Sequence, residues 1–134
     1  MVTNVSVPKY YIVPALVLIV LDILWILAFM GGKYKTMVEK IQRAPLKTNL
    51  LSVAMAYGLM VVGLWVFVLP KLKSTSRAVD AIFWGGLFGL VCYGIYNLTN
   101  GAIFSQWDFH LALRDMAWGG FVYSVAALLS WSMR

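Results

Sequence analysis

The chain has 134 residues, of which 62% are hydrophobic and only 12% are charged, with a net charge of +6. A soluble domain carries roughly half apolar and about a quarter charged residues, so the composition excludes a soluble enzyme, a disordered tail and a disulfide scaffold and predicts a single-domain integral membrane protein. In such a protein, excess positive charge faces the anionic lipid head groups of the bilayer, and no nucleic acid partner is expected.

Four apolar stretches are long enough to cross roughly 30 Å of hydrocarbon as helices of about 20 residues. In chain order they are residues 11–30, 50–69, 81–100 and 111–133. Backbone polar groups must be paired internally in lipid, and the alternating pattern of barrel strands is missing. The sequence therefore predicts an all-α, polytopic bundle of four transmembrane helices. An even number of spans places both termini on one side of the membrane, which we call the T side. The first and third loops lie on the opposite side, which we call the L side.

Residues 31–48 form a basic segment between the first and second spans. Tyr34, Met37, Val38 and Ile41 recur at helical spacing, which indicates a short amphipathic helix on the membrane surface that ends at Pro45. An ordinary solvated loop is the alternative. In either case, the positive charge concentrated in residues 31–48 favours a cytoplasmic L side. The basic side chains expected to face lipid head groups are Lys33, Lys35, Lys40, Arg43 and Lys47.

Polar side chains inside the spans are the best candidates for function, because they are costly in lipid and usually face the bundle interior or water. Asp22 lies within the first span, and Asp115 near the start of the fourth. On the third span, Tyr93, Asn97 and Asn100 follow one another at helical spacing and share one face. The span directions place both aspartates and both asparagines in the L-side half.

Each polar residue also has a structural interpretation. Asp115 could form an interfacial ion pair with Arg114, where a carboxylate also complements the helix dipole. Asn97 and Asn100 could join helices by hydrogen bonds. Asp22 is flanked by apolar residues on its own span and is the hardest to explain in this way.

The residues needed for common enzyme mechanisms are missing from the sequence. His110 is the single histidine and Cys92 the single cysteine, so no zinc site with the usual ligand spacing can be assembled. Nucleophile-elbow and phosphate-binding motifs are lacking too. We therefore expect neither an enzyme nor a bound metal or cofactor.

Three motifs are specific enough to compare with known families. They are Leu-Asp-Ile-Leu-Trp at 21–25, Tyr-Gly-Ile-Tyr-Asn-Leu-Thr-Asn at 93–100 and Asp-Met-Ala-Trp-Gly at 115–119. Together they resemble a family of small predicted membrane proteins known as a domain of unknown function, over nearly the whole chain. The resemblance implies a four-helix membrane protein and supplies no activity. The family usually has aspartate where this chain has Asn97. If that acid carries protons or binds a cation in the family, the chemistry here is weakened or moves to Asp22 and Asp115.

Two kinds of function remain open. The first is a small transporter or channel with a pocket open to the L side, formed by Asp22, Trp25, Tyr93, Asn97, Asn100, Asp115 and Trp118. The alternative is a non-catalytic accessory or structural subunit of a membrane complex, whose polar residues only join helices. Transport needs polar side chains around a hydrated cavity, whereas the accessory role predicts that they pair and leave none.

Small residues on the third span bear on assembly. Gly85, Gly86, Gly89 and Gly94 allow close helix contact. They predict a homo-oligomer or a stable association with a larger membrane complex.

Overall fold

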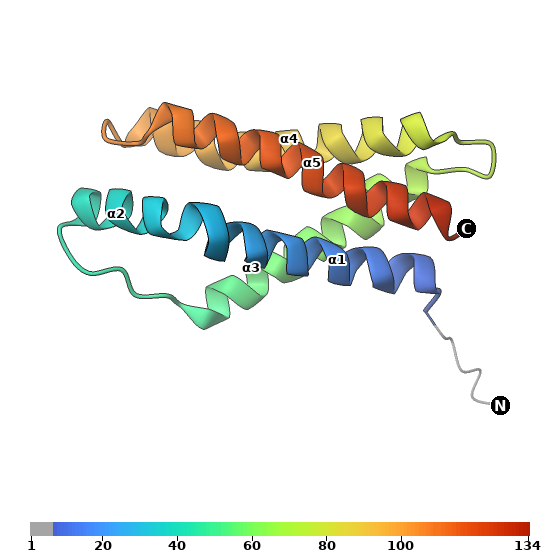
Figure 1. The fold of residues 1–134 in the computed structure, drawn as a ribbon, viewed down its shortest axis with the longest axis horizontal. Helices are drawn as coiled ribbons and strands as arrows, with labels where there is room; N and C mark the ends of the chain where they lie inside the picture. The colour runs from blue at the N-terminus through green and yellow to red at the C-terminus, as the bar shows by residue number, and fades with distance from the viewer. Residues whose placement is uncertain (1–6) are drawn as a thin grey trace.

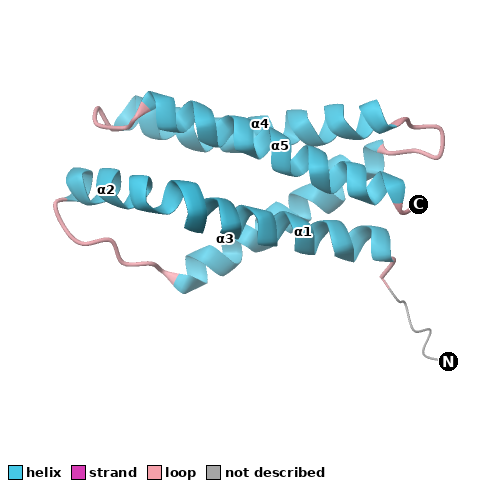
Figure 2. Cartoon of the chain, in the orientation of Figure 1, coloured by secondary structure: helices cyan, strands magenta, loops and turns pink. Residues whose placement is uncertain are grey.

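The computed structural model describes residues 7–134, and the regular secondary structure within them is all helical, joined by loops (Figures 1 and 2). The chain forms four helical rods. In order, these are α1 (Lys9–Trp25) with the π-helical turn η1 (Ile26–Met30) and α2 (Gly31–Gln42), then α3 (Leu50–Gly63) with η2 (Leu64–Val68) and η3 (Leu69–Lys71), then α4 (Ala78–Ile103), and finally α5 (Phe109–Ser132). All but one of the predicted span boundaries lie within about one helical turn of the ends of these rods. The exception is the predicted end of the first span at residue 30, because that rod continues to Gln42.

Three of the rods, Lys9–Gln42, Leu50–Lys71 and Ala78–Ile103, are long and apolar enough to cross a membrane. The fourth, α5, carries His110, Arg114 and Asp115 near its start. It is long enough, but its status as a span stays a prediction.

The basic segment differs from the expectation of a separate surface helix. Residues 31–42 are helical, but they continue α1 through the π turn without a break. A Cβ at Gly31 would lie 2.6 Å from the Ile26 carbonyl oxygen, so glycine permits the widened turn here and does not end the helix. The rod stops only at Arg43, whose backbone is left-handed. Tyr34, Met37 and Ile41 of α2 belong to a small apolar cluster with Trp107 and Leu111.

The tightest packing in the molecule joins α4 to α5. A Cβ on Gly89 would overlap the backbone carbonyl of Gly119, and one on Gly85 would overlap that of Tyr123. Both glycines are buried, and only a residue without a side chain lets two helix backbones approach so closely. Because α5 of the same chain occupies this face, Gly85 and Gly89 no longer support the predicted oligomer, which stays a prediction.

The start of α1 and the end of α5 lie at the same end of the bundle, here the T end (Figure 1). The Ser130 hydroxyl donates to the Tyr10 carbonyl at 2.7 Å, and the Trp131 indole donates to the Ser76 carbonyl at 2.8 Å. The Arg134 guanidinium donates to the carbonyls of Leu69, in η3, and of Leu72, the residue that follows η3. The largest apolar core, which contains Leu69, Leu72 and Ala127 from these same segments, therefore lies toward the T end.

The N-terminal half of α3 separates from the other helices (Figure 1). Every residue from 50 to 56 is exposed, whereas Gly63, Leu64 and Val68 at the other end of the rod are buried. The four rods therefore pack together at the T end, and three of them continue together toward the opposite L end.

The contact between α4 and α5 gives the first testable prediction. Gly89→Ala should lower the free energy of unfolding by about 1–3 kcal/mol, the usual range for overpacking, because the added methyl group meets the Gly119 backbone. Gly58→Ala is the matched control, since no heavy atom lies within 4 Å of a Cβ there. Unfolding in mixed detergent micelles measures both. Equal stability of the two variants would contradict the packing.

Candidate functional site

Six of the seven pocket residues expected from the sequence meet in one place. They are Asp22, Trp25, Tyr93, Asn97, Asp115 and Trp118. The seventh, Asn100, is only half-buried and is not among the residues that donate to Asp22 or Asp115. Its place in a functional pocket stays a prediction.

Asp22 accepts hydrogen bonds from three different helices. The hydroxyl of Tyr57 on α3 donates to Oδ2 at 3.0 Å. The hydroxyl of Tyr93 on α4 donates to Oδ1 at 2.6 Å, and the indole Nε1 of Trp118 on α5 donates to the same oxygen at 3.1 Å. The side chain is 6% exposed, so these donors replace the water that a carboxylate would otherwise bind.

Asp115 is held in the same manner and is 8% exposed. The amide Nδ2 of Asn97 donates to Oδ2 at 2.7 Å, and the indole Nε1 of Trp25 donates to Oδ1 at 3.3 Å. The ion pair considered for Asp115 and Arg114 is not formed. Arg114 is exposed, because consecutive residues point to different faces of a helix.

The two carboxylates and two indoles form a reciprocal arrangement, here called the Asp–Trp clasp. Trp25 follows Asp22 by three residues on α1, and Trp118 follows Asp115 by three residues on α5. Each indole donates to the aspartate of the other helix. The two rings stack with centroids 4.6 Å apart and planes within 3°. The Asp-x-x-Trp spacing therefore allows antiparallel α1 and α5 to exchange equivalent hydrogen bonds.

Asn97 connects the Asp–Trp clasp to the L end. Besides donating to Asp115, its amide donates to the backbone carbonyl of Tyr93 at 2.9 Å. Its oxygen accepts from the Tyr34 hydroxyl of α2 at 2.9 Å. Asn97 is fully buried and all its side-chain polar atoms are paired, as interhelical hydrogen bonding requires.

Two residues of the network were not selected from the sequence. Tyr57 and Tyr34 each supply a hydroxyl from a different rod. The available signal was weak, because tyrosines are common near membrane interfaces whatever they bind. Both tyrosines also fall where the pattern of the resembled family expects them, but that match does not show what they contact, which requires the helix packing.

The charges of the site are unbalanced. Among residues 7–134, no lysine, arginine or histidine nitrogen lies within 4.0 Å of a carboxylate oxygen, so both buried aspartates are served only by neutral donors. No group of three His, Cys, Asp or Glu suited to a metal ion occurs in the same range. The expected lipid-facing residues Lys33, Lys35, Lys40, Arg43 and Lys47 are all exposed, away from the site; their lipid contacts stay a prediction.

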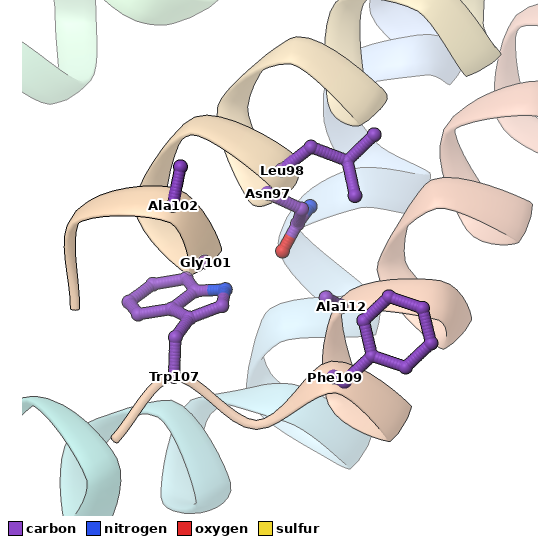
Figure 3. A pocket seen from close by; sticks show the side chains of 7 residues that line it. All are labelled: Asn97, Leu98, Gly101, Ala102, Trp107, Phe109 and Ala112. Atoms are coloured by element: carbon purple, nitrogen blue, oxygen red, sulfur yellow. The ribbon is translucent and has the colours of Figure 1, made fainter. Parts of the chain in front are cut away.

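A cavity of about 310 Å³ lies at the L end, between the end of α4 and the start of α5 (Figure 3). Its walls are Asn97, Leu98, Gly101, Ala102, Trp107, Phe109 and Ala112. The cavity thus reaches Asn97, but neither carboxylate lines it. A second cavity of about 300 Å³ lies on the α2 side of Trp107 and is also remote from the carboxylates.

The Asp–Trp clasp gives the second prediction. Trp118→Phe keeps the ring but removes the donor to Asp22, and it should lower the free energy of unfolding by about 0.6 kcal/mol and at most about 1.7 kcal/mol, the range of hydrogen bonds within membranes. Trp25→Phe in the same background should show coupling, because the two indoles stack on each other. A double-mutant cycle in mixed micelles measures this. Strict additivity would argue against a reciprocal unit.

Comparison with known proteins agrees with the architecture. The family model for a predicted membrane protein, DUF2177, matches residues 7–132. Searches of curated proteins and of solved structures give no match. With the match extending from before α1 to the end of α5, the chain belongs to the DUF2177 family of predicted membrane proteins.

Proposed function

We propose that the protein is a small proton-linked carrier and that the Asp–Trp clasp is the site at which it binds protons. The observation that supports this most is the burial of two carboxylates, both without a basic partner. Neutral donors from all four rods surround them: Trp25, Tyr34, Tyr57, Tyr93, Asn97 and Trp118.

The cost of burial argues for a role of the acid itself. Placing an aspartate in the middle of a spanning helix costs about 2.5–3.5 kcal/mol on insertion scales. Each aspartate uses both of its oxygens as acceptors, whereas an asparagine would offer one acceptor oxygen and turn an amide donor toward the Tyr57 hydroxyl or the Trp25 indole. Hydrogen bonding between helices therefore accounts for the acids, but it leaves their charge buried, and a bound proton would lower that cost.

The packing favours the proton over larger cations in this conformation. The oxygens of Asp22 and Asp115 already lie against protein donors, and neither residue lines one of the two cavities. A metal ion needs several ligands and a volume of its own, whereas a proton needs neither. A proton held by one aspartate would also remove one of the two unbalanced negative charges.

An accessory or structural subunit is the second candidate. It meets the criterion set out from the sequence, since the polar side chains satisfy one another, connect all four rods and leave both carboxylates outside the two cavities. In this role the network fixes the helices in place, and no proton needs to move.

Asp22→Asn distinguishes the two candidates. In proteoliposomes with an internal pH dye and a potassium diffusion potential that is negative inside, the wild-type protein should admit protons and acidify the interior, and the variant should not. Asp108→Asn is the matched control: Asp108 is exposed and caps α5 through Leu111, and asparagine caps equally well. The control should retain the proton flux.

The proton flux of each variant is interpreted together with its free energy of unfolding. Flux unchanged in folded Asp22→Asn protein would contradict the carrier. No flux in wild type, combined with lower stability of Asp22→Asn, would support the accessory role.

We further propose that α5 is the fourth span and that both termini lie on one side of the membrane, with the basic residues of the L end facing anionic lipid on the cytoplasmic side. The shared T end of α1 and α5 supports this. In a Cys92→Ala background, cysteines at positions 9 and 133 should react with the same impermeant reagent from the same side. Reaction from opposite sides would contradict four spans.

A further inference from the structure

The hydrogen-bond network around the Asp–Trp clasp contains three hydroxyl groups, which differ in chemistry from its other donors. An indole N–H only donates, and an amide does not titrate, whereas a hydroxyl both donates and accepts. Among the six neutral donors named above, only the hydroxyls of Tyr34, Tyr57 and Tyr93 can therefore take up one proton and release another.

Of these three hydroxyls, that of Tyr34 lies on the L-end side of the network. Tyr34 belongs to α2 and stands between Lys33 and Lys35, which are both exposed. Tyr57 instead follows the largely apolar residues 50–56 of α3, and Tyr93 lies in the middle of α4. Because charged lysine heads keep to water or to the head groups of the bilayer, Tyr34 is the network hydroxyl that lies near the L-side aqueous phase.

The Tyr34 hydroxyl also lies beside Asp115, the carboxylate of the clasp that is nearer to the L end. Asp115 accepts from Trp25, which is about one helical turn beyond Asp22 toward α2. The Tyr34 hydroxyl donates to Asn97 Oδ1 at 2.9 Å, and the same amide donates to Asp115 Oδ2 at 2.7 Å. The hydroxyl lies next to the Asp115 carboxylate itself as well, so a proton can pass between the two without crossing the amide.

Water can approach this hydrogen bond from the cavity of about 310 Å³ at the L end. The cavity reaches Asn97, the acceptor of the Tyr34 hydroxyl, and Trp107 forms another of its walls. The rings of Trp107 and Tyr34 pack with centroids 5.6 Å apart. The Trp107 Nε1 is buried and has no hydrogen-bond partner among the described residues, and Figure 3 shows this nitrogen on the edge of the ring that faces the cavity. Buried donors are usually paired with protein or ordered water, so this one indicates a hydrated cavity.

We infer that Tyr34 relays protons between Asp115 and water in the L-end cavity. This inference rests on the proposed carrier function and assigns the L-side step of its proton path. When the site unloads, the O–H bond of protonated Asp115 breaks and its proton bonds to the Tyr34 oxygen, while the original Tyr34 hydroxyl proton passes to a water molecule. Tyr34 stays neutral, Asp115 becomes a carboxylate and the water becomes hydronium. Loading is the reverse of these steps.

Tyr34→Phe tests the relay, because it removes the hydroxyl and keeps the ring that packs on Trp107. In the proteoliposome assay its proton flux should fall by about 100-fold or more, the lower end of what a positioned proton-transfer group contributes. Tyr96→Phe is the matched control. Tyr96 also packs on Trp107, with ring centroids 6.0 Å apart, but it is 54% exposed and is not among the donors to Asn97 or to either aspartate. The control should keep the wild-type flux.

A second measurement separates a relay from a hydrogen bond that only holds helices together. After transfer into deuterium oxide, infrared spectroscopy follows isotope exchange at the protonated carboxyl, whose C=O band is identified by its loss in Asp115→Asn. A relay predicts slower exchange in Tyr34→Phe, since the path from water is interrupted. A purely structural bond predicts faster exchange, because its loss loosens the packing around the acid. Exchange in Tyr34→Phe that is as fast as in wild type, or faster, would overturn the inference.

The relay and the carrier fail in different ways. Proton flux that persists in Tyr34→Phe but is lost in Asp22→Asn would overturn the relay and leave the carrier standing. Absence of flux in the wild-type protein would overturn the carrier, and the relay with it. Lost flux and slowed exchange in Tyr34→Phe, with both unchanged in Tyr96→Phe, is the expected result.

Discussion

The burial of two carboxylates in an apolar bundle is the constraint from which the arrangement of the helices follows. In lipid, no water is present to form hydrogen bonds with an unpaired polar group. Every oxygen of Asp22 and Asp115 must therefore accept from a donor on another helix. α1 and α5 satisfy each other through the Asp–Trp clasp, α4 contributes Tyr93 and Asn97, and α3 contributes Tyr57. The network therefore fixes which helix faces are turned inward, since apolar contacts with lipid or with another helix differ little in free energy.

Close packing of α4 on α5 gives this network its register. Gly89 and Gly119 bring the two backbones together, and Tyr93 lies one helical turn beyond Gly89 toward the L end. A Cβ on Gly119 would overlap the Tyr93 ring, so the same glycine that permits the helix contact also leaves room for the tyrosine that reaches Asp22. The small residues, which the sequence suggested for assembly between chains, thus serve the site within one chain.

Much of the site could be predicted because a polar residue in an apolar span is conspicuous. Asp22, Asn97 and Asp115 stood out in this way, and the span directions alone were enough to bring them to a similar depth. Asn100 looked equivalent to Asn97 at a spacing of three residues, yet only Asn97 lies against α5 and α2. Tyr34 was missed because Gly31 looked like the end of a helix, whereas the π turn carries the rod onward and places α2 over the site. Such turns depend on packing and leave no periodic signal in the sequence.

Tyr57 lies at the border between the packed part of α3 and its exposed N-terminal segment. On one side of it, α3 packs toward the T end, where η2 and η3 contribute Leu64, Val68 and Leu69 to the apolar core; on the other side, seven residues contact little. A movement of the free half of α3 would therefore act on the Tyr57–Asp22 hydrogen bond before any other contact of the network. Asp22 would keep Tyr93 and Trp118 as donors, so losing one bond changes its environment without dismantling the Asp–Trp clasp. The Asp–Trp clasp therefore depends on the packing of α1, α4 and α5, and Tyr57 adds one donor from the border of the exposed segment of α3.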